Sequence, residues 1–133
     1  MLTITRRIDQ GIVIVGRGIR IVPINIGTKH VRLGIKADPN IPILRGELVG
    51  QEEAQLRKNS GKGMLVLARI TGQTVMIDNE IEIKVLEIVK GDGNKSTNEV
   101  ELEIIAQEGT IILPEELVNP TSPEGQSPIG RRL

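Results

Sequence analysis

The sequence contains no phenylalanine, tryptophan or tyrosine among its 133 residues. Aromatic rings are the platforms on which bases stack in most single-strand RNA-binding modules, so any recognition of nucleic acid here has to rest on Arg, Lys and backbone groups. Cysteine is absent too, which excludes disulfides, thiolate zinc sites and thiol nucleophiles. The single histidine, His30, cannot assemble a multi-histidine metal site, and we expect it to be exposed in a turn beside Lys29. We therefore expect no cofactor, no metal and no enzymatic activity.

Long apolar runs are missing as well. No segment approaches the roughly 18 consecutive apolar residues that a membrane span needs. The N-terminal residues 1–7 lack the apolar stretch and cleavage site of a signal peptide. The mean hydropathy of -0.05 is that of a globular protein. The sequence thus predicts a cytoplasmic protein that makes no membrane contact.

The sequence does contain an internal repeat. Residues 1–7 (MLTITRR) reappear 63 residues later as residues 64–70 (MLVLARI). The similarity continues, since residues 12–14 match 75–77, residues 31–35 match 100–104, and residues 41–48 match 110–117. Such self-similarity outweighs the prior that a chain of this length forms one domain.

Each copy consists of five short runs of alternating apolar and polar residues, separated by Gly, Asn and Asp, which is the pattern of antiparallel strands. Turn residues favour tight turns at 16–18 and 78–79 and a longer hairpin loop at 90–96. We expect a mostly β fold in which two five-stranded repeats, residues 1–60 and 64–118, share one core.

Two further segments have distinct compositions. Residues 47–58 are rich in Glu, Gln, Ala, Leu and Arg, which predicts a short linking helix that Asn59, Ser60 and Gly61 bring to an end. Residues 119–133 hold Pro, Ser and Gly without apolar periodicity, so we expect a disordered tail.

A net charge of zero conceals a division between the two copies. Residues 1–62 carry 11 Lys and Arg against 5 Asp and Glu, a net charge of +6, whereas residues 63–133 carry 6 against 12, a net charge of −6. Phosphate binding is dominated by Coulomb attraction and counterion release. Only the first copy therefore has the charge expected of a nucleic-acid-binding unit.

The runs MLTITRR at residues 1–7 and IPILRGEL at residues 41–48 resemble the first strand, and the last strand plus helix start, of the CsrA/RsmA carbon storage regulator family. Residues 64–86 resemble its first half again, so the chain resembles a tandem-repeat member. The resemblance implies an RNA-binding post-transcriptional regulator whose ligand is a GGA-containing loop of an mRNA or small RNA. Members of this family are homodimers with interlocked strands, in which strand one of one subunit and strand five of the other form each RNA site.

The resemblance also implies which residues contact RNA. It assigns strand contacts to Thr5, Arg6, Arg7 and Arg45, and it places Ala37, Ile41 and Leu44 beside the base pocket. Arginine suits this role because its guanidinium offers fork-shaped donors to guanine O6 and N7 or to phosphate. Without the resemblance, Arg6 and Arg7 would be interpreted as solvated charges on an edge strand.

The second copy departs from this pattern. It retains Arg69 as an RNA-contact candidate, but Ala68, Ile70 and Pro114 replace Thr5, Arg7 and Arg45. Two repeats in one chain imply an intrachain pseudo-dimer, in which each site would combine one intact and one degenerate half. A homodimer built through first repeats would restore two full sites, and the sequence leaves both arrangements open. If the family's parallel pairing of strand five with strand one holds, the linking helix becomes a strand-helix-strand crossover.

A different class of function also fits the sequence. The chain can be a divergent protein-binding module that has lost most RNA binding. In that case its acidic half engages a basic partner, or the fused halves antagonise a standard member of the family. An antagonist protein that binds this chain is a further expected partner.

Overall fold

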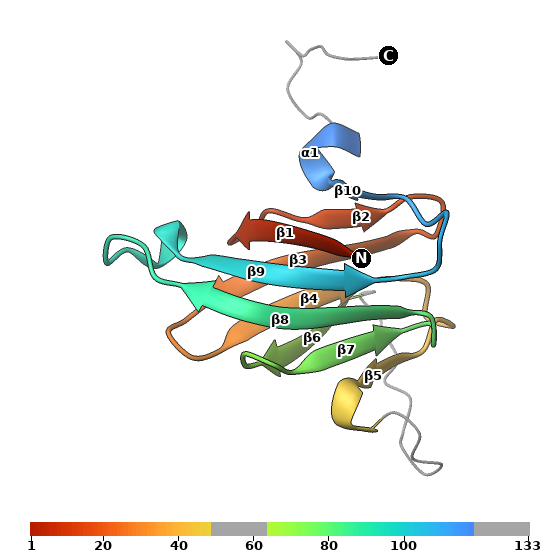
Figure 1. Ribbon diagram of the computed structural model, residues 1–133, viewed down its shortest axis with the longest axis horizontal. Coiled ribbons are helices and arrows are strands. Elements are labelled where there is room, and N and C mark those ends of the chain that lie inside the picture. Colours follow the sequence, from red (N-terminus) through yellow and green to blue (C-terminus); the bar gives the residue numbers. More distant parts are fainter. Residues whose placement is uncertain (49–63, 119–133) are drawn as a thin grey trace.

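The computed structural model describes residues 1–48 and 64–118, which form two five-stranded sheets (Figure 1). The elements of the first copy are β1 (Leu2–Arg7), β2 (Ile12–Ile14), β3 (Ile19–Ile26), β4 (Val31–Lys36), β5 (Ile43–Arg45) and the 3₁₀ turn η1 (Gly46–Leu48). Those of the second copy are β6 (Met64–Arg69), β7 (Thr74–Ile77), β8 (Ile81–Val89), the 3₁₀ turn η2 (Lys95–Thr97), β9 (Glu99–Ile105), β10 (Ile112–Pro114) and the helix α1 (Glu115–Val118).

The two copies interlock through their first and last strands. Sheet A has the order β1-β9-β8-β7-β5, and sheet B has the order β10-β2-β3-β4-β6. Each sheet therefore takes its three central strands from one copy and both edge strands from the other. This arrangement confirms the predicted fold class, a mostly β pseudo-dimer made within one chain.

The expected parallel pairing is wrong. Strand β5 pairs antiparallel with β7, and β6 pairs antiparallel with β4, so strand five of the first copy and strand one of the second lie in different sheets. Because all described pairings are antiparallel, no parallel crossover is needed between the copies. The predicted linking helix begins where η1 lies, while its remainder and the predicted disordered tail fall outside the described residues.

One aliphatic core fills the space between the sheets. Alternate residues of the strands point inward, and the buried side chains of both copies join in a single cluster. Its fully buried members include Ile21, Leu33 and Ile35 from sheet B and Ile83 and Leu102 from sheet A. Burial of each such side chain stabilises the fold by roughly 1.5–3 kcal/mol. The shared core explains how two copies of about 55–60 residues, too small to bury much surface alone, form a stable unit.

The turns follow the residue types that favour them. Gly16 and Gly18 have φ angles of 82° and 67°, and Asp78 and Asn79 both have φ of 57°. Glycine adopts this left-handed region without penalty, and Asn and Asp tolerate it better than other residues do. His30 is exposed, as expected. Among the described residues, no helix has the length and apolar character needed to cross a membrane.

Candidate nucleic-acid interface

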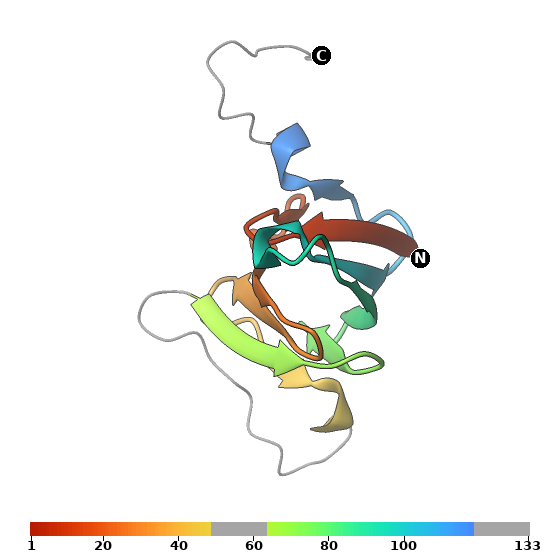
Figure 2. The same cartoon turned by 90° about the vertical axis from the view of Figure 1, so that its left-hand side faces the viewer.

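Two junctions between edge strands lie at opposite ends of the molecule (Figure 2). The first junction, which we call the N-terminal junction, consists of β1, β10 and α1. The second, the central junction, consists of β6, β5 and η1. Of the described strands, only β9 pairs with β1 and only β4 pairs with β6, so each of these edge strands leaves one row of backbone N–H and C=O groups outside the sheet ladder.

Arg6 ties the N-terminal junction together. Its Nη1 and Nη2 donate to the two carboxylate oxygens of Glu116 at 3.0 and 3.1 Å, while Nη1 also donates to the Gly11 carbonyl at 3.2 Å and Nε to the Thr5 carbonyl at 3.0 Å. The residue is only 8% exposed. This two-pronged contact from a buried arginine fixes β1 against the helix that follows β10.

Arg69 repeats the same contacts at the central junction. Its Nη1 and Nη2 donate to Glu47 at 2.8 and 3.1 Å, Nη1 also donates to the Thr74 carbonyl at 3.1 Å, and Nε donates to the Ala68 carbonyl at 2.8 Å. The residue is 4% exposed. The two proposed RNA contacts Arg6 and Arg69 thus direct their guanidiniums to partners inside the protein.

The neighbours of these arginines face solvent. Thr5 and Arg7 are exposed on β1, and Arg7 Nε donates to Glu99 at 3.2 Å. Arg45 is half-buried on β5 and forms no ion pair with any other residue that the structure describes. Of the side chains that the resemblance placed beside the base pocket, Ala37 and Leu44 are buried, and Ile41 packs against the core.

The fold does not bring the three strand arginines of the first copy together. Strands β1 and β5 are the two edges of sheet A, separated by three strands, so Arg6 and Arg7 lie roughly 19 Å or more from Arg45 at ~4.8 Å per strand. Arg45 instead shares the central junction with Arg69, where both lower the pKa of Glu47. Each end of the monomer thus holds only some of the RNA-contact arginines that the family resemblance assigned to one site.

Carboxylates that the sequence analysis did not single out complete both junctions. Glu47 and Glu116 hold the buried arginines, and Glu115 accepts hydrogen bonds from Arg20 at 2.8 and 3.0 Å and from the Gly11 N–H at 3.2 Å. The sequence did contain a signal for two of these carboxylates, because Glu47 and Glu116 occupy the same position in the two copies. Among the described residues, β1, β10 and α1 carry two arginines and two carboxylates, whereas β5, β6 and η1 carry two arginines and one carboxylate.

Hydrogen bonds from arginine hold these carboxylates in their charged form. The hydrogen bond from Arg69 is the main reason that the pKa of Glu47 falls to about 2. In the same way, Arg20 lowers the pKa of Glu115 and Arg6 lowers that of Glu116.

This charge pairing predicts acid sensitivity. Because the folded-state pKa of Glu47 lies below its unfolded value, its stabilising contribution is present above about pH 4.5 and is lost as the pH falls toward about 2. We expect the melting temperature to fall across that window, and Glu47→Gln to melt lower than the parent at neutral pH and to lose less on acidification. Circular dichroism melts at a series of pH values measure this, with Glu108→Gln, at an exposed turn position, as the matched control. Parallel pH profiles for Glu47→Gln and the parent would contradict the assignment.

Comparison with known families adds one finding. Residues 1–54 match the family model of CsrA, described as a global regulator protein family. The match includes β1 through η1 and so contains every candidate contact of the first copy. No solved structure matched the chain.

Proposed function

We propose that the protein is an RNA-binding post-transcriptional regulator that recognises GGA-containing loops of mRNA or small RNA, because residues 1–54 match the model of the CsrA global regulator family. One observation supports this most directly. The family-matched segment contains both the edge strand β1, with Thr5 and Arg7 exposed, and the guanidinium of Arg45, which forms no ion pair within the described part of the chain. We assign ligand contact to these exposed and half-buried polar groups.

The proposed mechanism uses backbone and guanidinium groups in place of aromatic stacking. The outer N–H and C=O groups of an edge strand read base edges, while Arg7 and Arg45 donate to guanine O6 and N7 or to phosphate. Arg6 and Arg69 hold the edge strands in position. Ala37, Ile41 and Leu44 supply the apolar wall beside the bases.

We infer that the central junction is the stronger of the two sites. Arg45 lies there with one surplus positive charge, whereas the N-terminal junction has Pro114 at the corresponding position and carboxylates that balance its arginines. Proline carries neither a guanidinium nor a backbone N–H, so it offers RNA no hydrogen-bond donor.

A gel shift with a GGA hairpin, repeated across salt concentrations, tests the function. We expect specific binding that falls steeply as salt increases, because each phosphate contact releases counterions. A hairpin with the same stem and a scrambled loop is the matched control. Equal binding of the two hairpins would reduce the protein to a generic basic patch and contradict the proposed recognition.

The rival function, a protein-binding module or antagonist of a standard family member, is favoured by the acidic composition of the second copy. It predicts no preference for GGA at any salt concentration. The same gel shift therefore separates the two functions. An antagonist would lower the RNA binding of a standard family member when the two proteins are mixed, without binding the hairpin itself.

A further inference from the structure

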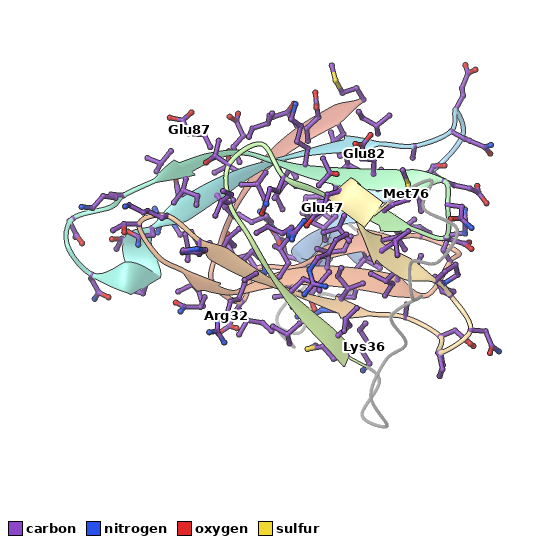
Figure 3. All side chains as sticks on the ribbon, turned by 90° about the horizontal axis from the view of Figure 1, so that it is seen from below. Arg32, Lys36, Glu47, Met76, Glu82 and Glu87 are labelled. Atoms are coloured by element: carbon purple, nitrogen blue, oxygen red, sulfur yellow. The ribbon has the colours of Figure 1, made fainter. Side chains whose placement is uncertain are left out.

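The outer faces of the two sheets carry opposite charge. The strands of sheet B contain no Asp or Glu, and their outward-facing cations are Arg20, which pairs with Glu115 of α1, and Arg32 and Lys36. The strands of sheet A present five outward-facing carboxylates against two outward-facing cations, Arg7 and Lys84; the carboxylates are those of Glu82, Glu87, Glu99, Glu101 and Glu103. Figure 3 shows Arg32 and Lys36 on the side of the molecule opposite Glu82 and Glu87. The basic first copy and the acidic second copy thus contribute to opposite outer surfaces of the folded molecule.

Each face has one pair of like charges directly across neighbouring strands, although on sheet A Lys84 also lies opposite Glu103 and Arg7 opposite Glu99. Arg20 is opposite Lys36 on neighbouring strands of sheet B, and Glu87 is opposite Glu101 on sheet A. Such cross-strand pairs destabilise an isolated sheet. Glu115 of the same chain offsets the repulsion at Arg20. The Glu87–Glu101 pair on sheet A breaks a local rule in the way expected at a functional surface, where a partner of opposite charge offsets the repulsion.

Aliphatic side chains accompany the charges on both faces. Ile24 and Val66 are 36% and 44% exposed on the outer side of sheet B, and Val89 and Ile105 are 42% and 41% exposed on the outer side of sheet A. Arg32 and Lys36 are exposed and form no ion pair with the other described residues. Each face therefore combines available charge with apolar surface that contact with a partner would bury.

We propose that the outer face of sheet B in one copy of the protein docks on the outer face of sheet A in a second copy. The argument is complementarity, because each molecule carries both halves of the contact on opposite sides. The formal net charge is zero, so no long-range repulsion between copies opposes it. Since the two surfaces differ, the contact is heterologous, and copies add head to tail.

The size of the faces predicts a weak contact. Five strands ~4.8 Å apart and about six residues long at roughly 3.3 Å per residue cover on the order of 400–500 Å². Two such faces bury less than the roughly 1,200 Å² of a standard stable interface. Association should therefore appear only at high protein concentration and weaken as salt screens the charges. This inference is independent of the proposed RNA site, which lies at the strand edges.

Sedimentation velocity on the nuclease-treated full chain tests the proposal. At about 50 mM salt the average mass should rise with protein concentration, and at about 500 mM salt it should return toward that of the monomer. A parent protein that stays monomeric at every concentration at low salt would overturn the proposal. So would association that disappears with nuclease treatment, because RNA would then be the ligand of the basic face.

Charge reversal gives the sharper test. Arg32→Glu with Lys36→Glu makes both faces acidic. Glu101→Lys with Glu103→Lys changes the sheet A face from two cations against five carboxylates to four cations against three, so both faces are then basic. Each double variant alone should be monomeric, but a mixture of the two should associate, because every contact then joins an acidic face to a basic one. Circular dichroism melts confirm that both variants are folded. Self-association of either variant at the parent's level, or a mixture of folded variants that fails to associate, would refute the face-to-face contact.

Discussion

Replacing Arg45 with alanine is expected to weaken binding of a GGA hairpin roughly tenfold or more. A hydrogen bond to a charged group is worth about 1.5–3 kcal/mol, and about 1.4 kcal/mol corresponds to a tenfold change in affinity. Arg45 forms no ion pair with the other described residues, so its loss should not release another charge or unfold the sheet. Gel shifts of the variant and the parent at one fixed salt concentration measure the change.

Pro114 supplies the matched control, because Pro114 lies opposite Ile12 in β10 as Arg45 lies opposite Val75 in β5. Pro114→Ala should change affinity little, since proline has no donor to lose. Pro114→Arg should strengthen binding by a similar tenfold factor by completing the junction that contains Arg6 and Arg7. If Arg45→Ala binds the hairpin as well as the parent does, the transferred site is wrong and the protein-binding function takes its place.

The second large effect concerns residues 1–60 made without the second copy. In the whole chain, β1 and β5 pair with β9 and β7, which come from the other copy. Alone, this segment has no such partners, and a second molecule of the same segment can supply equivalent strands. We expect a homodimer whose two junctions both combine Arg6 and Arg7 with Arg45. Its affinity for the hairpin should exceed that of the parent roughly tenfold or more, because each site gains a charge-assisted donor.

Sedimentation equilibrium and gel shifts on that segment check this expectation. Arg45→Ala introduced into it should remove the gain, since both sites would lose the same guanidinium. A folded monomer would contradict the requirement for interlocking. A dimer that binds no better than the parent would contradict the idea that the parent's sites are incomplete.

Much of the fold could be predicted from the sequence because strands have a period of two. Alternation identified the strands, the repeat implied a shared core, and glycine, asparagine and aspartate indicated the tight turns. The pairing of strands could not be obtained in this way. Pairing depends on which edge each terminal strand joins, and residue patterns within a strand do not specify its neighbour.

The candidate site was predicted less completely, although the two-residue alternation of β1 did indicate the orientation of Arg6. One face of β1 carries Leu2, Ile4 and Arg6, and the other face carries Thr3, Thr5 and Arg7. Because the apolar face points to the core, alternation alone places Arg6 on the core side. The burial of Arg6 beside Glu116 is consistent with its position on this face. The opposite charge of the two outer faces could not be foreseen. It follows from the exchange of edge strands, which assigns the central strands of each sheet to a single copy.

That exchange of strands affects how the protein is made. When β2, β3 and β4 emerge from the ribosome, the strands that flank them in sheet B, β6 and β10, have not yet been synthesised. At roughly 5–20 residues per second, several seconds pass before the last of these strands follows. During that time the apolar faces of the first half have no native partner in their own chain, and another nascent chain on the same message offers equivalent strands. Translation speed and ribosome spacing thus influence whether each chain closes on itself or exchanges strands with its neighbour.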